Sequence, residues 1–457
     1  MGADRSRLPS LGPETGFTFP EIRRRALPNG VRVCTVEHHA VPLITVLVLM
    51  PVGASADPPD RPGLTAITGD LLDEGSGDLN ALEVHEALGR IGAQLDTEVG
   101  SDATVLEVTT LERFAPRGLE LLADMVRRPR LEQRDFDRVR ELRLNRLVQL
   151  RDMPPALADR VFAQLLYKGH PYGHLPIGTE GSLRALTLRD ITSFHRRAYH
   201  PARATVIAVG DAPHERLADL VERAFDSWTA EQPVPEALPE PASLPTPPAP
   251  PDKVALVHRT AAAQSELRIG HVGLPRSTPD YHALLVLNMV LGGQFVSRLN
   301  MNLREAKGYT YGVRTSFDFR RGPGPFVLHA SVGSEVTADA VREALGEMRA
   351  IRGDRPVTRS ELELGRAALT RGYPRSFETA EQLGRAAAQL ALYELPDDYY
   401  TTFVPRVLAL TEEDVTRAGA RHIDPARLLT VIVGDREKIG PALQRLDLGA
   451  ASEIAVA

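Results

Sequence analysis

The sequence is poor in residues that mark several classes of protein. Lysine is nearly absent. Of the 54 lysine and arginine residues, the only lysines are Lys168, Lys253, Lys307 and Lys438. The net charge of −6 gives no basic footprint for nucleic acid or an anionic membrane. Cys34 is the only cysteine, which excludes an intrachain disulfide and a cysteine-based metal cluster.

Long hydrophobic runs are also missing. Residues 1–21 contain no apolar core of the kind that a secretory signal needs. The longest apolar run, Leu43–Met50, is too short to span a bilayer. We therefore expect a cytoplasmic protein without nucleic-acid or membrane partners, and a periplasmic location is left open.

The chain has the composition and length of a globular protein with two or three domains. Of its 457 residues, 43% are hydrophobic and 25% are charged. Nine prolines between Glu231 and Pro251 exclude a helix or an inner strand and predict an extended linker. The expected segments are an unpaired arm (1–25), a first domain (26–230), the linker (231–252), a second domain (253–445) and a tail (446–457).

The two halves contain a related stretch. Residues 186–211 read LTLRDITSFHRRAYHPARATVIAVGD, and residues 410–435 read LTEEDVTRAGARHIDPARLLTVIVGD. At a constant offset of 224 residues, Pro-Ala-Arg, Val-Gly-Asp and several single residues recur without a gap. This predicts two copies of one unit of roughly 220 residues. The order of strands and helix pairs predicts an α+β fold, with helices on one face of a mostly antiparallel sheet in each unit.

The stretch Leu291–Val313, LGGQFVSRLNMNLREAKGYTYGV, combines a glycine pair, a helix pattern and two tyrosines. Residues 301–307 favour a helix, Gly308 is typical of a helix stop, and the alternation after it predicts a strand. Because the turn folds the strand back along the helix, we expect Arg304 and Tyr311 to lie side by side. A guanidinium and a phenol placed there can donate hydrogen bonds to a peptide carbonyl or an oxyanion.

This stretch resembles a segment of the insulinase, pitrilysin and mitochondrial-processing-peptidase family, which are zinc peptidases with an inverted H-x-x-E-H motif. The family pattern GG-x-F-x-S-R-L-x-x-x-L-R-E-x-x-G-x-x-Y is matched in order from Gly292 to Tyr311. The resemblance implies two α/β-sandwich units that form half of a clamshell. It also implies that Arg304 and Tyr311 are catalytic and that Gly292, Gly293 and Tyr309 lie at the substrate, although Tyr309 has packing as an equal alternative.

The zinc motif of the family is degenerate in this chain. Catalytic members carry G-x-A-H-F-L-E-H-M, in which two histidines bind zinc and the glutamate is the base. The equivalent stretch here, GLTAITGDLLDEGS, places Ala66 and Asp70 at the histidine positions and Gly69 at the glutamate. Counting back from Pro154 places Arg146 at the third ligand. We therefore expect no metal site and no cofactor in this chain.

The resemblance includes two-chain members in which one subunit holds zinc and the other supplies the arginine and tyrosine. The leading hypothesis is therefore the non-zinc subunit of a heterodimeric zinc metallopeptidase, inactive alone, with zinc on a homologous H-x-x-E-H partner. Its substrates would be unfolded peptides, bound as an extended strand at a sheet edge. The alternatives are a catalytically inactive structural or peptide-binding relative, and an autonomous hydrolase that uses another metal or none.

Other candidate sites have a plainer interpretation. His170 and His174 have ligand-like spacing, as do His195 and His200, but the sequence places no third ligand near either pair. The loop 322–325, Gly-Pro-Gly-Pro, predicts a connection between strands and not a phosphate site.

Overall fold

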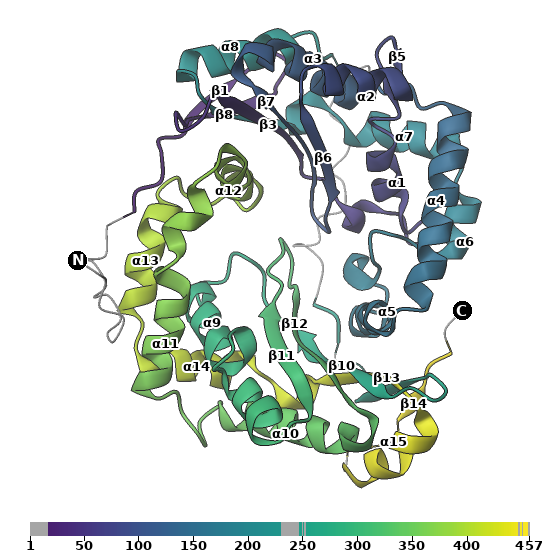
Figure 1. Cartoon of the computed structure of the whole chain (residues 1–457), viewed down its shortest axis with the longest axis vertical. Helices are drawn as coiled ribbons and strands as arrows, with labels where there is room; N and C mark the ends of the chain where they lie inside the picture. The colour runs from purple at the N-terminus through teal and green to yellow at the C-terminus, as the bar shows by residue number, and fades with distance from the viewer. Residues whose placement is uncertain are drawn as a thin grey trace, which may run out of the picture.

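The computed structural model describes residues 17–229, 246–248, 250, 253–446, 448–449 and 451–455. They form two α/β units, one above the other in Figure 1, each built on a six-stranded sheet. The strand order is β1-β2-β8-β3-β7-β6 in the first sheet and β11-β12-β10-β13-β9-β14 in the second. The predicted linker lies outside the described residues apart from 246–248 and 250.

The first unit contains strands β1 (Arg23–Ala26), β2 (Arg32–Glu37), β3 (Leu43–Met50), β4 (Gly75–Ser76), β5 (Leu79–Asn80), β6 (Gln94–Val99), β7 (Thr104–Leu111) and β8 (Thr205–Gly210). Its helices are α1 (Leu64–Asp70), α2 (Ala81–Arg90), α3 (Ala115–Arg127), α4 (Gln133–Arg151), α5 (Pro154–Leu166), α6 (Glu180–Ala185), α7 (Leu188–Ala198) and α8 (His214–Phe225).

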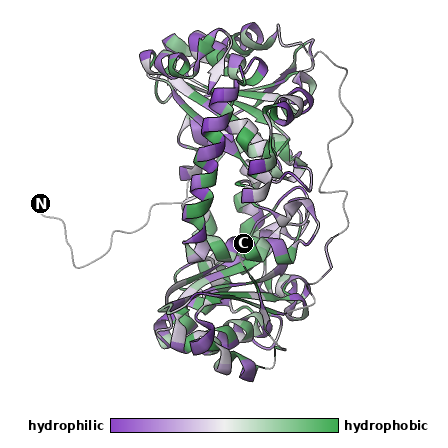
Figure 2. Cartoon of the chain, turned by 90° about the vertical axis from the view of Figure 1, so that its right-hand side faces the viewer, coloured by the Kyte–Doolittle hydropathy of each residue, from purple (hydrophilic) through white to green (hydrophobic). Residues whose placement is uncertain are grey.

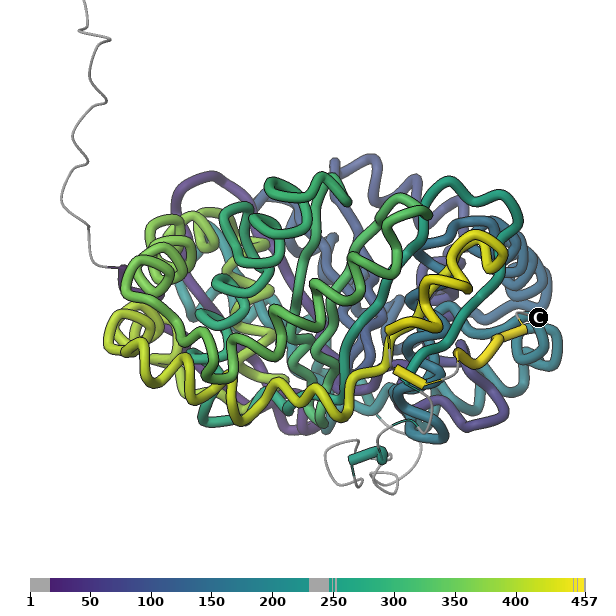
Figure 3. The backbone as a smooth tube through the Cα atoms, turned by 90° about the horizontal axis from the view of Figure 1, so that it is seen from below, coloured from purple at the N-terminus to yellow at the C-terminus, as the bar shows by residue number. Residues whose placement is uncertain are grey.

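The second unit contains strands β9 (Val254–His258), β10 (Gln264–Val272), β11 (Thr310–Phe317), β12 (Pro325–Gly333), β13 (Leu429–Gly434) and β14 (Ser452–Glu453). Its helices are α9 (Tyr281–Asn288), α10 (Thr337–Ala350), α11 (Arg359–Thr370), α12 (Ala380–Leu392), α13 (Tyr399–Ala409), α14 (Glu412–His422) and α15 (Arg436–Leu443). Two π-helical turns, η6 (Met289–Gly293) and η7 (Asn300–Ala306), lie between α9 and β11. Figure 3 shows the helices of this unit along the underside of the molecule.

The predicted repeat is confirmed by equivalent elements in the two units. Helices α7 and α14 begin 224 residues apart, at Leu188 and Glu412, and strands β8 and β13 have the same offset. Both helices begin with a capping box, in which a threonine and an aspartate three residues later bind each other's main-chain N–H groups. Strand β8 pairs in parallel with β2, as β13 does with β9. Each sheet is therefore mostly antiparallel, with one parallel pair in the first sheet and two in the second, where β14 also pairs in parallel with β9.

The expected unpaired arm is wrong at its end. Residues Arg23–Ala26 form β1, which pairs antiparallel with β2 at the edge of the first sheet. Just before it, the ring of Phe17 stacks on Phe377 with centroids 4.7 Å apart, and Phe19 packs on Tyr400 at 5.0 Å. The aromatic residues of this segment therefore join the first sheet to the second unit.

Each sheet has one face covered by a helix from the other unit. Strand Leu43–Met50 is buried almost throughout, so both of its faces need apolar cover. Helices α3 and α8 pack on one face of the first sheet, and α12 of the second unit packs on β3 and β8 from the other. Gly384 allows this contact, because a Cβ there would lie 2.4 Å from Leu47 Cδ1.

The second sheet receives α5 of the first unit in the same way. Helix α5 packs on β10 and β13, and Arg268 Nε donates to Asp159 Oδ1 over 2.5 Å at this contact. The expected arrangement, helices on one face of each sheet, therefore describes each unit alone but not the assembled chain. Figure 2 shows the sheets mainly green and the outward helix faces largely purple. No helix in the described parts of the chain is long and apolar enough to cross a membrane.

Candidate functional site

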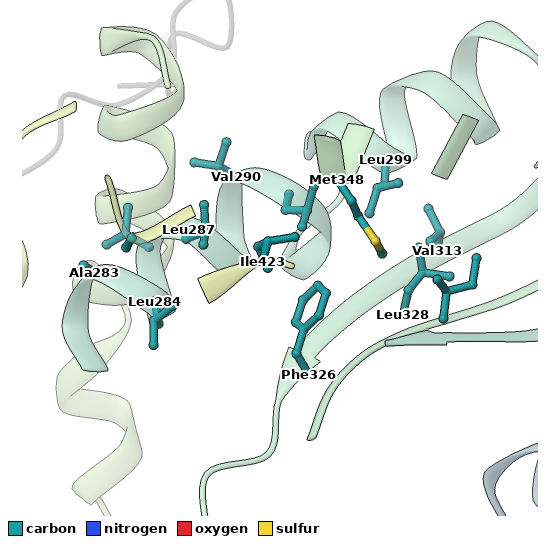
Figure 4. Packing of buried hydrophobic residues seen from close by; sticks show 14 of the residues in the cluster. Ala283, Leu284, Leu287, Val290, Leu299, Val313, Phe326, Leu328, Met348 and Ile423 are labelled. Carbon is teal, nitrogen blue, oxygen red and sulfur yellow. The ribbon is translucent and has the colours of Figure 1, made fainter. Parts of the chain in front are cut away.

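The arginine and the tyrosine that the sequence singles out lie on η7 and on the edge strand that follows it. Turn η7 ends at Ala306, and Gly308 takes a φ of 65°, a left-handed conformation that costs glycine little. Strand β11 then begins at Thr310. The predicted helix stop and strand are confirmed. Beneath them, Leu299 of the loop and Val313 of the strand enter the core shown in Figure 4.

Arg304 and Tyr311 both remain accessible to a ligand. The side chain of Arg304 is 36% exposed, and its guanidinium carbon lies 4.3 Å from the centre of the Phe295 ring. Its Nε is 3.5 Å from the carboxylate of Glu305. Tyr311 is 90% exposed. The structure records no hydrogen bond between Arg304 and Tyr311, so their convergence on one substrate group stays a prediction.

The other residues expected at the substrate have packing roles. Gly292 is buried, and a Cβ there would lie 2.6 Å from Thr315 Oγ1, so this glycine allows close packing against β11, and its place at the substrate stays a prediction. Gly293 is partly buried, and a Cβ there would lie 2.7 Å from Asn288 Nδ2. Tyr309 is half-buried against the core of the second unit, which agrees with the packing alternative.

Arg298 belongs to the matched pattern, but sequence reasoning gave it no role. Its side chain is 4% exposed and donates to both carboxylate oxygens of Glu361, over 2.6 and 2.8 Å. It also donates to the carbonyls of Arg355 and Pro356. Burial alone would raise the pKa of Glu361, but the hydrogen bonds from Arg298 and Thr358 outweigh it and lower the pKa to about 2. Arg298 therefore fixes the loop before η7 to α11.

Sequence reasoning also missed Asn300, which closes part of the sheet edge. Its amide accepts from the N–H of Val313 over 3.1 Å and donates to the carbonyl of Val313 over 2.7 Å. The main-chain N–H and carbonyl of Val313 that face the open edge of the sheet are therefore both occupied. A peptide strand cannot pair with β11 at this residue. An asparagine in a helical pattern carries no signal of such a contact, since most are solvated.

The degenerate zinc-motif positions lie in the other unit, on α1 and α4. Ala66 is buried, and Asp70 accepts from Arg143 Nε over 2.6 Å. A Cβ at Gly69 would lie 2.8 Å from Val99 Cγ2, so Val99 occupies the place where a glutamate side chain would begin. Arg146 is exposed and donates to Gln149 Oε1 over 3.2 Å. These residues do not fit zinc.

Two of these positions, Asp70 and Arg146, line a cavity of about 670 Å³ that has both acidic and basic side chains in its wall. Its lining includes Asp70, Asp73, Glu74, Arg143 and Arg146. Burial, followed by the charge of Glu74, raises the pKa of Asp73. Among the described residues, no group of three or more histidine, cysteine, aspartate or glutamate side chains is placed to hold a metal.

The histidine pairs have the structural roles that their plainer interpretation predicts. His170 Nδ1 accepts from the N–H of Tyr172, and His174 Nε2 lies 3.1 Å from the buried carboxylate of Asp57. Burial lowers the pKa of His195 to about 4, and its Nε2 donates to the carbonyl of Val126. His200 Nδ1 accepts from the N–H of the second residue after it.

Comparisons with known proteins find relatives that are named as peptidases. An uncharacterized zinc protease of Mycobacterium tuberculosis is 27% identical over 432 residues, which cover 93% of this chain and 96% of that protein. A probable mitochondrial-processing peptidase subunit beta of Arabidopsis thaliana is 21% identical over 278 residues, which cover 60% of this chain and 51% of that protein.

The fold is shared with a solved structure of a peptidase M16 inactive domain from Pseudomonas fluorescens. The TM-score is 0.83 at 22% identity, over 91% of this chain and 98% of that one. A family model described as insulinase (peptidase family M16) matches residues 32–179, and one described as the peptidase M16 inactive domain matches residues 185–369. These two models of one family span most of both units, and the chain belongs to the insulinase (M16) peptidase family.

Proposed function

We propose that this chain is the non-zinc subunit of a two-chain zinc peptidase, in which Arg304 and Tyr311 act on a peptide held at the zinc of a homologous partner. The observation that carries the proposal is a contrast between the two units. In the first unit the metal positions hold Ala66, Asp70 and Arg146, a set with one carboxylate that cannot hold zinc in the usual way, and Val99 occupies the space beside Gly69. In the second unit, Arg304 and Tyr311 stay open to solvent on a firmly packed support.

The proposed chemistry needs only hydrogen-bond donation from this chain. The guanidinium of Arg304 and the hydroxyl of Tyr311 donate to the substrate carbonyl oxygen and hold the negative charge that it gains in the tetrahedral intermediate. Each donor of this kind contributes about 3 kcal/mol to transition-state stabilisation. The partner's zinc would supply the activated water.

The substrates we propose are unfolded peptides, because a folded protein cannot present an extended strand to a sheet edge. Since Asn300 occupies the edge of β11 at Val313, the peptide would pair with a strand of the partner and meet this chain mainly through side chains.

The test is to mix this chain with a homologue from the same host that carries H-x-x-E-H, and to measure cleavage of a quenched, unstructured peptide. We expect each chain to be inactive alone and the mixture to cleave in a chelator-sensitive manner. Arg304→Ala and Tyr311→Phe should each lower kcat/KM of the mixture by about 100-fold. Arg342→Ala is the matched control, because Arg342 is also a partly exposed arginine beside a carboxylate, that of Asp339.

Cleavage by the mixture that Arg304→Ala and Tyr311→Phe leave unchanged would contradict the proposal. Peptide binding by this chain without cleavage in any mixture would instead indicate the peptide-binding alternative.

A further inference from the structure

Asn300 links the two elements that carry the residues to which the proposed function assigns the chemistry. It is the first residue of η7, the turn that carries Arg304, and its side chain binds β11 two residues after Tyr311. We propose that Asn300 is a positioning residue that fixes the register of Arg304 relative to Tyr311. This inference rests on the proposed function of those two residues.

The side chain of Asn300 joins η7 to the loop before it and to β11 through hydrogen bonds. The residue is 6% exposed. Its Nδ2 donates to the carbonyl of Gln294 over 3.2 Å, to Ser297 Oγ over 3.1 Å and to the carbonyl of Val313 over 2.7 Å. Its Oδ1 accepts from the N–H of Val313 over 3.1 Å. A side-chain amide carries a donor and an acceptor, so it can stand in for a neighbouring strand at one residue.

The hydrogen bonds of Asn300 lie next to an irregular part of the strand. Strand β11 has a bulge, in which Tyr311 and Gly312 stand opposite the single residue Ser331 of β12. The regular ladder resumes at Val313. A bulge frees a side chain to point in a new direction, but it also removes main-chain pairing that would hold that side chain in place. The hydroxyl of Thr310 spans the bulge, because it donates to the carbonyl of Ser331 over 2.7 Å and accepts from the N–H of Gly312 over 3.1 Å. Asn300 holds Val313 on the other side of Tyr311, so the position of Tyr311 depends on both contacts.

Arg304 depends on the same contact from the other side. Its own contacts in this chain are the ring of Phe295 and the carboxylate of Glu305, and neither belongs to β11. The π-helical turn that carries it is joined to the strand in two ways. The N–H of Tyr309 donates to the carbonyl of Leu303 over 2.8 Å, and Asn300 makes its two hydrogen bonds with Val313. Asn300 thus contributes to the positions of both proposed donors.

Asn302 provides a matched control on the same turn. Its Nδ2 donates to Glu343 over 3.2 Å and to Glu347 over 2.9 Å, both on α10, and not to β11. Loss of Asn302 removes two hydrogen bonds from η7 without touching the link to the strand. A general loosening of the turn and a loss of register can therefore be separated.

The experiment compares Asn300→Ala, Asn302→Ala, Arg304→Ala and the double variant Asn300→Ala/Arg304→Ala in the mixture with the zinc-bearing homologue, by kcat/KM on the quenched peptide. Hydrogen exchange of the Val313 amide is measured on each chain alone. We expect Asn300→Ala to lower kcat/KM by about 10- to 100-fold and Asn302→Ala by less than about 3-fold. In the double variant, Asn300→Ala should add less than it costs alone, because the part of its effect that passes through Arg304 is already lost.

Asn300→Asp is the second variant, because it keeps the shape and the acceptor for the Val313 N–H but has no donor when ionised. Its kcat/KM relative to that of the unmodified chain should rise as the pH falls, since a protonated carboxyl regains a donor. Faster exchange of the Val313 amide should accompany the loss in Asn300→Ala and not in Asn302→Ala.

Two failures are distinguishable. If the unmodified mixture cleaves, Arg304→Ala abolishes cleavage, and Asn300→Ala behaves like Asn302→Ala, the positioning role is wrong and the proposed function stands. If the unmodified mixture does not cleave, or Arg304→Ala has no effect, the proposed function and the positioning role both fall.

Discussion

Val99 blocks the space that a glutamate side chain would need at position 69, where catalytic members of the family carry their base. It lies at the end of β6, and its Cγ2 would be 2.8 Å from a Cβ at Gly69 of α1. Real Cβ contacts are longer, so any side chain at position 69 forces either the helix or the strand to move. A glycine in a helix otherwise costs about 1 kcal/mol relative to alanine. Close packing against Val99 therefore outweighs the preference of the helix for alanine over glycine at position 69.

This contact predicts a sign change in a double-mutant cycle. Gly69→Ala should lower the free energy of unfolding by about 1–3 kcal/mol, because the added methyl group overpacks the site. In a Val99→Ala background the same change should be neutral or stabilising, since the obstructing Cγ2 is gone and the helix gains alanine. Urea unfolding of the four chains measures both values, and a loss from Gly69→Ala that is equal in both backgrounds would contradict the packing explanation.

The ion pair of Arg298 with Glu361 predicts a pH-dependent contribution to stability. The folded-state pKa of Glu361 is lowered to about 2 from 4.5. A lowered carboxyl pKa stabilises the fold above the unfolded value, and this stability is lost as the pH falls from 4.5 towards 2. Arg298→Ala should cost about 3 kcal/mol at pH 7, and the difference from the unmodified chain should shrink towards pH 3.

Arg359 is the control for that measurement. It pairs with Glu363 on α11, the helix that also carries Glu361, but the side chain of Arg359 is 84% exposed. Arg359→Ala should change stability little at either pH. An Arg298→Ala effect that does not depend on pH would show that its contacts to main-chain carbonyls, and not its charge, hold the loop.

Single residues show how far sequence reasoning reaches. Gly308 was predictable because a helix stop with a left-handed φ leaves a compositional signal. The roles of Arg304 and Tyr311 rest on the resemblance to the family pattern and stay a proposal. Asn300 and Val99 were not predictable, because each acts through a contact with a segment that is distant in the sequence or across a turn. Such contacts depend on tertiary packing, which local patterns do not encode.

Helices α12 and α5 are the elements that hold the two units together. Each packs on the sheet of the other unit, with Arg385 of α12 placed over the edge of the first sheet. Arg385 lies within 2.8 Å of Asp96, 3.2 Å of Glu98 and 3.1 Å of Glu107. Of these carboxylates only that of Glu107 is buried, and burial raises its pKa although Arg385 opposes the change.

This cluster predicts that Arg385→Ala destabilises the chain more at high pH than at low pH. Without the guanidinium, the pKa of buried Glu107 rises further above its unfolded value. A carboxyl with a raised folded-state pKa favours the fold when protonated, so stability returns as the pH falls through that pKa. We expect a loss of about 2 kcal/mol at pH 8 that is smaller at pH 5. Arg385→Lys, which keeps the charge, should show a smaller loss, and equal losses at the two pH values would contradict this reasoning.

The packing of α12 and α5 on the sheet of the other unit was not predictable from the sequence. An amphipathic helix shows that one of its faces is buried, but not which sheet covers it. The repeat at an offset of 224 residues predicted two equivalent sheets and was confirmed. The repeat could not show that α12 and α5 cross between them, because in the sequence each helix stands beside the strands of its own unit.

The whole molecule is therefore joined by packing as well as by the covalent link at residues 231–252. The first sheet contributes Leu47 and Ile207 to the same core cluster as Leu267 and Phe326 of the second unit. At about 25 cal/mol per Å² of buried apolar surface, such a core stabilises the association strongly.

This packing predicts that the two units stay together after the link is cut. A protease recognition sequence placed within residues 231–245 should yield two fragments that co-elute in size-exclusion chromatography without denaturant. The same cut in a chain with Gly384→Val should release the fragments more easily, since the added methyl groups would meet Leu47. Separation of the fragments after cleavage of the unmodified chain would show that the exchanged helices contribute little.

The central claim is that Tyr311 faces the zinc helix of a partner, and a photo-crosslink tests it most directly. Tyr311 is replaced by p-benzoylphenylalanine, the chain is mixed with the zinc-bearing homologue, and the crosslinked peptides are identified by mass spectrometry. Leu408, which is exposed on α13, is replaced in the same way as a control. The account predicts crosslinks from position 311 to the partner's H-x-x-E-H helix or to a bound peptide, and none there from position 408. Crosslinks from position 311 only to surfaces remote from that helix, or none to the partner at all, would contradict it.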